Sequence, residues 1–210
     1  ENEIRDEIVA HGRSMFARGL TSGSTGNLSA RVEDGVIVTP TGASLGDLDP
    51  ARLSKLDHDG RHVSGDPPTK EASLHTAVYA QRSAAAAVVH LHSTHAVAVS
   101  CLDDVDPADA LPPLTPYFVM RVGVLPMIPY FPPGDDALAD AVEAMAATHH
   151  AILMANHGTV VAGKTMADAV YATEELEETA KLFLMLHGRT TRPLTPAQVD
   201  VLRNRFPIKA

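Results

Sequence analysis

Two histidines separated by one residue are the most chemically suggestive feature of the sequence. His90 and His92 follow Val88 and Val89, in a stretch that is typical of a buried β-strand. Alternate side chains of a strand point to the same face, so the two imidazoles would project together, about 7 Å apart. Imidazole nitrogens bind zinc at about 2.0–2.1 Å, and two converging rings can share one ion. The pair therefore predicts a metal site that needs a third ligand.

Several other histidines could complete this site, and spacing alone does not choose among them. His157 follows an apolar run over residues 151–155 and precedes a glycine. Such a position suits a ligand, because a glycine lets the backbone approach closely. His149 and His150 fall at the end of a predicted helix, where histidine often interacts with the last carbonyls. His95 falls in the first turn of another predicted helix and could flank the site.

A carboxylate and two loops of small residues accompany the histidines. Glu71 ends the stretch Pro-Pro-Thr-Lys-Glu at the start of a predicted helix. A carboxylate there could take part in chemistry, or it could simply favour the helix N-terminus. Residues 23–27 (Gly-Ser-Thr-Gly-Asn) and 39–42 (Thr-Pro-Thr-Gly) offer hydroxyls, an amide and backbone N–H groups that could hold a phosphate. Each loop alone also fits an ordinary turn.

The elements that must position these residues interleave helices, strands and hairpins. The expected helices cover residues 3–19, 70–81, 135–148, 165–186 and 195–204, and another begins near Ser93. The expected strands cover residues 28–32, 36–39, 55–57, 61–64, 86–92, 150–155 and 159–162. Thr69 is expected to cap the helix over 70–81. The mixture predicts an α/β fold, a three-layer α/β/α sandwich with a mixed, mainly antiparallel central sheet.

Length and composition limit the class of protein. The 210 residues favour one domain over residues 1–210, and the single cysteine, Cys101, excludes an internal disulfide framework. The net charge of −9 argues against a surface for nucleic acid or anionic membranes. No run approaches the ~18 apolar residues of a membrane span, and the charged first residues do not match a signal peptide. We expect a soluble cytoplasmic protein with no nucleic-acid or membrane partner.

Over about residues 1 to 190 the sequence resembles the class II aldolase/adducin family. The resemblance rests on motifs that occur in the family's order: Gly26-Asn27-Leu28-Ser29, Thr39-Pro40-Thr41-Gly42, Pro68-Thr69-Lys70-Glu71, His90-Leu91-His92 and Asn156-His157-Gly158. It implies the fold of fuculose-phosphate aldolase and ribulose-phosphate 4-epimerase.

The resemblance also implies a set of site residues. One divalent metal per chain, usually zinc, would be held by His90, His92 and His157. Glu71 would be the catalytic acid/base and would also bind the resting metal, and Tyr117 would assist proton transfer as a second catalytic residue. The family is commonly a homotetramer with its site near a subunit interface. The implied residues for substrate phosphate are Asn27, Thr41, Gly42 and Thr69.

Lys70 departs from the family's pattern, which has a second small hydroxyl residue before the glutamate. A lysine adds a cation, which suits a substrate that carries a carboxylate as well as a phosphate. The alternative interpretation is that Lys70 is a solvated residue in the first turn of the helix. Stretches over residues 42–48, 53–57, 89–95 and 112–117 are similar to 3-oxo-tetronate 4-phosphate decarboxylases of bacterial four-carbon acid-sugar pathways. The implied reaction is a metal-dependent decarboxylation through an enediolate, which yields dihydroxyacetone phosphate and CO₂.

Two other functions stay open at this point. A sugar-phosphate aldolase or 4-epimerase of the same family would use the same ligands, and an aldolase forms the same enediolate by releasing an aldehyde in place of CO₂. An interaction domain like that of adducin would keep the fold without the active site. The three motif histidines and Glu71 argue against this non-enzymatic alternative.

Overall fold

The computed structural model describes residues 1–208 and is built around one eight-stranded sheet. The strands are β1 (Asn27–Val32), β2 (Gly35–Val38), β3 (Ser54–Leu56), β4 (His62–Ser64), β5 (Ala87–Leu91), β6 (Met127–Ile128), β7 (Ala151–Met154) and β8 (Gly158–Gly163). Their order across the sheet is β4-β3-β2-β1-β5-β8-β7-β6. All neighbours pair antiparallel except β6 and β7. The predicted mixed, mainly antiparallel sheet is confirmed.

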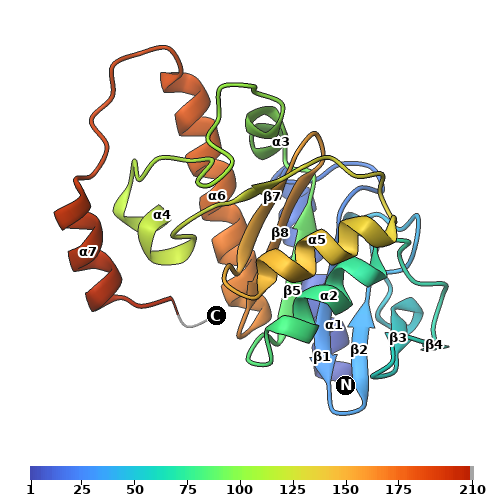
Figure 1. Cartoon of the computed structure of the whole chain (residues 1–210). Coiled ribbons are helices and arrows are strands. Elements are labelled where there is room, and N and C mark those ends of the chain that lie inside the picture. The colour runs from blue at the N-terminus through green and yellow to red at the C-terminus, as the bar shows by residue number, and fades with distance from the viewer. Residues whose placement is uncertain (209–210) are drawn as a thin grey trace.

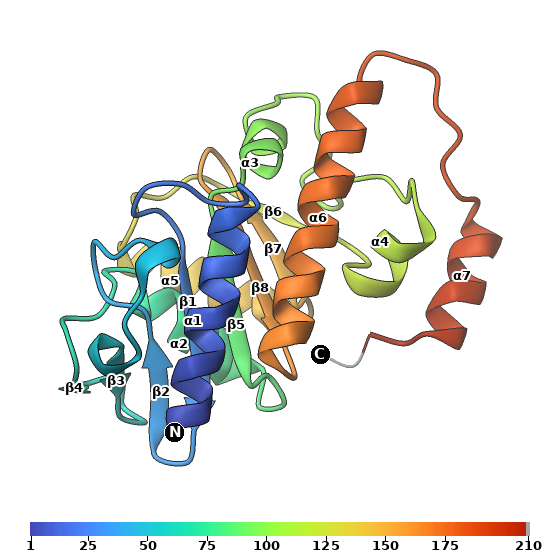
Figure 2. The ribbon, with the colours of Figure 1, turned by 180° about the vertical axis from the view of Figure 1, so that it is seen from behind.

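Helices cover both faces of this sheet. On one face lie α2 (Ala72–Gln81) and α5 (Asp136–Ala146), which stand in front of the strands in Figure 1. On the other lie α1 (Asn2–Ala17), α3 (Thr94–Ser100) and α6 (Met166–Leu186), as Figure 2 shows. Apolar side chains of the sheet pack against both helical layers. The predicted three-layer sandwich is therefore confirmed.

The remaining helices lie outside these layers. Two short 3₁₀ turns, η1 (Leu45–Asp47) and η2 (Pro50–Arg52), connect β2 to β3. Helices α4 (Pro116–Arg121) and α7 (Pro196–Arg205) pack together beside α6, at the edge of the molecule in Figure 1. Among residues 1–208, no helix combines the length and the apolar character that a membrane crossing needs.

Two local predictions need correction. The helix expected from residue 70 begins at Ala72, and its N-cap residue is Glu71, so Thr69 does not cap it. The Thr69 hydroxyl instead accepts a hydrogen bond from the backbone of Glu71 in the turn before the helix. Strand β6 lies in a proline-rich stretch where no strand is expected, and it pairs with β7 over only two residues. Such short pairing leaves little periodicity to detect.

Strand β5 carries His90 into the centre of the molecule, whereas His92 follows the strand, which ends at Leu91 and not at the expected residue 92. The strand lies between β1 and β8, and all five of its residues are buried. Val89 and Leu91 face the layer of α1 and α6, whereas Val88 packs on the layer of α2 and α5. His90 shares the second face, because side chains alternate along a strand. A fully paired central strand gives this imidazole a rigid support.

Candidate metal centre

Four of the predicted site residues meet where β5 ends and β8 begins. Ligand atoms of Glu71, His90, His92 and His157 all lie within 4.8 Å of one another. Glu71 Oε1 is 3.0 Å from His157 Nε2, and Glu71 Oε2 is 3.3 Å from His90 Nε2. The Nε2 atoms of His90 and His92 are 2.9 Å apart. Three imidazoles and one carboxylate form a donor set that suits zinc and other divalent cations.

The backbone around His157 explains how this residue reaches His92, which lies 65 positions earlier in the sequence. His157 lies in the tight turn between β7 and β8, where Asn156 adopts the left-handed conformation with φ of 55°. A Cβ atom on Gly158 would come within 2.3 Å of the Leu91 carbonyl oxygen. Only glycine therefore lets β8 approach β5 closely enough there. The sequence expectation that a glycine makes room beside this histidine is confirmed.

Hydrogen bonding and burial prepare the imidazoles as ligands. His90 Nδ1 donates to the carbonyl of Thr159 at 2.8 Å. This contact leaves the free lone pair of His90 on Nε2, which faces the cluster. Metal-binding histidines commonly donate their other ring N–H to a backbone carbonyl in this way. Burial, together with the neighbouring His90 and His157, lowers the pKa of His92 from 6.5 to about 4. A neutral imidazole keeps a free electron pair for a metal.

The carboxylate of Glu71 has the charge that a metal ligand needs. Burial raises the pKa of this carboxyl, but contacts with His157, His90 and Asn27 outweigh burial and hold the pKa below its ordinary value. Glu71 Oε1 and His157 Nε2 are both buried, and their contact lacks the geometry of a hydrogen bond. Buried polar atoms without hydrogen bonds are costly. A divalent cation would satisfy both atoms, so the residues fit a bound metal.

The other histidines have separate partners. His95 lies 2.7 Å from Glu177 through Nδ1, and the same carboxylate accepts the backbone N–H groups at the start of α3. The ring of His150 contacts two backbone carbonyls, and His149 contacts Thr148. None of the three belongs to the metal cluster. Geometry therefore selects His157 from the candidates that the sequence left open.

The predicted phosphate-binding residues adjoin the cluster. Asn27 pairs with His90 across β1 and β5, and its side-chain nitrogen donates to both Thr69 and Glu71. Backbone bonds from Thr69 to Thr39 and from Thr41 to Pro67 hold the two loops side by side. Thr41 and Gly42 are exposed beside the buried Thr69.

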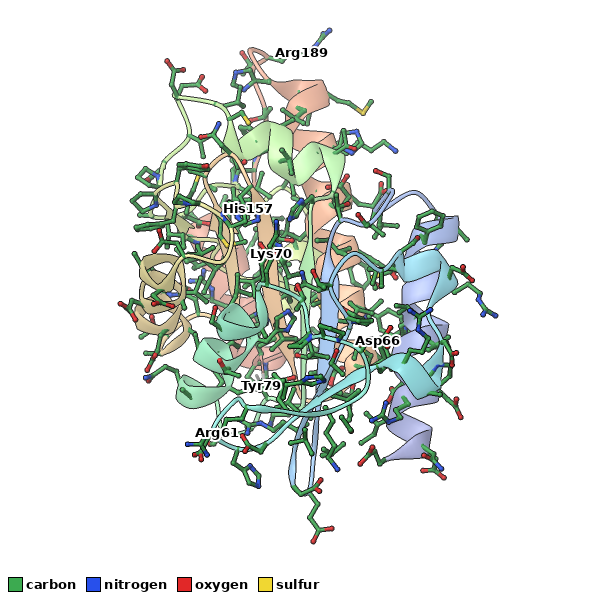
Figure 3. The ribbon with its side chains drawn as sticks, turned by 90° about the vertical axis from the view of Figure 1, so that its right-hand side faces the viewer. Arg61, Asp66, Lys70, Tyr79, His157 and Arg189 are labelled. Carbon is green, nitrogen blue, oxygen red and sulfur yellow. The ribbon has the colours of Figure 1, made fainter. Side chains whose placement is uncertain are left out.

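Lys70 and Tyr117 differ in their relation to this site. Lys70 is exposed next to Glu71, close enough for its charge to contribute to lowering the pKa of His92. Figure 3 shows Lys70 beside His157. Tyr117 lies on α4, with 58% of its surface exposed. It lines a hollow with Arg121 and Phe206 and contributes nothing to the cluster of its own chain.

Three buried polar residues behind the site are absent from the sequence-based set. His75, Ser29 and Tyr79 form a hydrogen-bonded chain that leads to Asn27. Two spacings could have revealed them. Positions 71, 75 and 79 recur every four residues on one face of a helix, and positions 27 and 29 alternate along a strand.

Comparison with known sequences agrees with this geometry. Residues 6–184 match the family described as the class II aldolase and adducin N-terminal domain. The chain belongs to this family. It is 50% identical over 202 residues to the 3-oxo-tetronate 4-phosphate decarboxylase of Haemophilus influenzae, with 96% of each chain covered. It is 31% identical over 208 residues to the L-fuculose phosphate aldolase of the same organism, covering 97% of this chain and 94% of the relative.

A solved structure of the family also superimposes closely on this chain. YgbL from Escherichia coli gives a TM-score of 0.94 at 45% identity, with 96% of this chain and 98% of that chain covered. The resemblance of residues 1–190 to the class II aldolase/adducin family is thereby confirmed.

Proposed function

We propose that this enzyme is a carbon–carbon lyase that decarboxylates 3-oxo-tetronate 4-phosphate to dihydroxyacetone phosphate and CO₂. The observation that carries the proposal is the converging set of Glu71, His90, His92 and His157, in a chain half identical to a decarboxylase of that substrate over nearly its whole length. The reaction breaks the bond between C1 and C2, CO₂ leaves, and C2 takes up one proton.

We propose that His90, His92, His157 and Glu71 hold one zinc ion, or another divalent metal, per chain. When bound, such a cation supplies positive charge that favours the loss of CO₂ from a 3-oxo acid. The lowered pKa of the His92 imidazole and the ionised carboxylate of Glu71 support this ligand set.

The chain's own residues would bind the two ends of the substrate. Asn27, Thr41, Gly42 and Thr69 would hold the phosphate, since Asn27 contacts both Thr69 and Glu71, and the loop of Thr41 and Gly42 is bonded to the loop that precedes Thr69. Fixing the phosphate places the reacting carbons against the cluster, which replaces a chance encounter by a set geometry. Lys70, on the same side, would contact an anionic group of the substrate.

Glu71 would handle the proton that C2 requires. Its carboxylate is ionised, and Asn27 holds Oε2 at 2.9 Å, so it can relay a proton from water to the carbon. Tyr117 is exposed on α4, and family members are commonly tetramers with the site near an interface. We propose a homotetramer in which Tyr117 assists proton transfer at the site of a neighbouring subunit.

The whole chain, residues 1–210, would act as one domain, because the strands between Asn27 and Gly163 form a single sheet. A cytoplasmic location fits a substrate that carries two charged groups, since such a molecule does not enter the bilayer core. Sedimentation velocity tests the tetramer: a monomer at micromolar concentration would refute it.

A coupled assay for dihydroxyacetone phosphate tests the reaction. The metal-loaded enzyme is given 3-oxo-tetronate 4-phosphate or L-fuculose phosphate, and CO₂ and aldehyde are measured separately. We expect CO₂ and dihydroxyacetone phosphate in equal amounts from the first substrate. Faster release of aldehyde from the second would instead favour an aldolase, the activity of the relative at 31% identity. Glu71→Gln is the control for contaminating enzymes.

A further inference from the structure

A continuous chain of buried polar side chains runs from the interior of α2 to Glu71. The Tyr79 hydroxyl lies 3.0 Å from Ser29 Oγ, which lies 2.7 Å from His75 Nδ1. On the other side of the ring, His75 Nε2 contacts Asn27 Oδ1 at 2.5 Å, and Asn27 Nδ2 donates to Glu71 Oε2 at 2.9 Å. Figure 3 shows Tyr79 toward one end of the molecule and Lys70 and His157 above it.

Every member of this chain is shielded from water. His75 is 1% exposed, Ser29 is 0% exposed, and Asn27, Tyr79 and Glu71 are each 5% exposed or less. Burying an imidazole, an amide and two hydroxyls is costly unless each is paired. Simple packing of the core would have been served by apolar side chains at these positions. The network therefore needs an explanation other than core stability.

The hydrogen-bond partners determine the direction of every bond. Glu71 is ionised and can only accept, so the NH₂ group of Asn27 must face it and the Asn27 oxygen must face His75. That oxygen can only accept, so the proton of the His75 ring lies on Nε2. Nδ1 then accepts from Ser29, which in turn accepts from Tyr79. All four bonds point toward the carboxylate of Glu71.

Burial keeps the His75 ring neutral, as this pattern requires. It lowers the pKa of His75 from 6.5 to about 3, and the nearby His90 adds to this effect while Glu71 opposes it. The ring is therefore neutral at physiological pH. With Ser29 donating to Nδ1, the only ring proton stays on Nε2 and points at Asn27.

We infer that His75 is a positioning residue whose Nε2 proton holds the Asn27 amide in the one orientation that donates to Glu71. A reversed amide would place its oxygen against the carboxylate, where two acceptors repel. Without the donor on His75, Asn27 can reverse or rotate, and Glu71 loses the contact that fixes Oε2. The inference rests on the proposed role of Glu71 in proton transfer and metal binding.

Three variants separate positioning from stability. His75→Leu keeps the bulk but removes both hydrogen bonds of the ring. His75→Gln keeps a donor, because a glutamine side-chain nitrogen reaches the place of the histidine Nε2. Thr173→Val is the matched control: it removes a buried hydrogen bond to Ala169 in α6, outside the network. For each we would measure kcat, KM, the dissociation constant for zinc and the thermal unfolding midpoint.

We expect His75→Leu to lower kcat by about 10- to 100-fold, the usual effect of losing a residue that orients a metal ligand. KM should change less than kcat, because Thr41, Gly42 and Thr69 would still hold the phosphate when Asn27 turns, and zinc binding should weaken by about tenfold. His75→Gln should recover most of the loss in kcat and most of the loss in zinc affinity. Thr173→Val should leave kcat and zinc affinity unchanged while its unfolding midpoint is similar to that of His75→Leu.

Two results would overturn the inference. One is a kcat for His75→Leu that falls no further than that of Thr173→Val. The other is a His75→Gln variant that folds but performs no better than His75→Leu. If His75→Leu fails to fold, Ser29→Ala carries the same test, since it removes the donor that holds His75 Nδ1, together with the partner of the Tyr79 hydroxyl, and leaves the ring itself in place. It should lower kcat by about three- to tenfold, and an unchanged kcat would refute the proposal.

The same measurements distinguish this inference from the proposed function. If the wild type turns over the phosphorylated 3-oxo acid but the variants do not show the expected order of kcat, only the role of His75 is refuted. Absence of wild-type turnover refutes the decarboxylation instead. The order of zinc affinities, which requires no substrate, then still decides whether His75 positions Glu71.

Discussion

Replacement of Lys70 by serine tests the choice of substrate most directly. Serine restores the small hydroxyl residue that is usual in the family at this position, so the backbone before α2 should tolerate it. Lys70 is exposed and precedes Glu71, and its charge acts on His92. We therefore expect Lys70→Ser to weaken kcat/KM for 3-oxo-tetronate 4-phosphate while leaving zinc content and the unfolding midpoint unchanged.

The exposure of Lys70 sets the size of the effect. Two unit charges 4 Å apart interact by about 1 kcal/mol in water and by about 4 kcal/mol at an effective dielectric constant of 20. An exposed ammonium group that a bound substrate partly covers lies nearer the first value. About 1–2 kcal/mol corresponds to a decrease of roughly 5- to 30-fold in kcat/KM. Salt should narrow the difference between the two enzymes, because exposed charges are screened.

The assay is the coupled measurement of dihydroxyacetone phosphate at two ionic strengths. Lys164→Ser is the matched control, since Lys164 is also an exposed lysine but follows β8 at the end away from His157. It should leave kcat/KM unchanged. If Lys70→Ser also leaves kcat/KM unchanged, the side chain points to solvent throughout the reaction. The preference for an acid substrate then loses its structural support and rests on sequence similarity alone.

Further outcomes follow from the same geometry. His92→Ala should weaken zinc binding and lower activity, because it removes one of the four converging ligand side chains and leaves the other three arranged for a fourth; a zinc titration checks this, and an unchanged dissociation constant would contradict the ligand set. Glu71→Gln should keep the fold and, with zinc in excess, most of the bound zinc, but lower kcat by about 10²- to 10⁴-fold, whereas near-normal turnover would leave Glu71 a helix-terminus carboxylate. His75 should make stability depend on pH: its pKa is about 3 in the folded chain against 6.5 normally, so below pH 6.5 only the unfolded chain takes up the proton. The stabilising contribution is complete above pH 6.5 and is lost as pH falls toward 3. Denaturant titrations with chelator present measure the free energy of unfolding at each pH. Between pH 6.5 and 3 this free energy should fall more steeply in the wild type than in His75→Gln, by up to about 1.4 kcal/mol per pH unit. Equal slopes would refute the lowered pKa of His75.

The sequence alone determined the layers of the fold and most of the elements. Helix α1 could be predicted because its apolar residues recur on one face, and β7 because it is a short apolar run between turns. The His-x-His pair at the end of β5 and the glycine after His157 carried enough local information to identify these histidines as candidates. Those features depend on neighbours in sequence: alternation along a strand, and the room that a glycine leaves for the backbone.

Only the tertiary structure decided how these pieces combine. The choice of His157 over His95, His149 and His150 depends on which turn the antiparallel pairing of β5, β8 and β7 brings beside His90. The chain from Tyr79 to Glu71 joins a helix to β1 across more than 40 positions of sequence. Neither spacing nor composition predicts such contacts, because a hydrogen bond between distant residues depends on the packing of whole layers. Local patterns therefore predicted which side chains could do chemistry, whereas packing decided which of them meet.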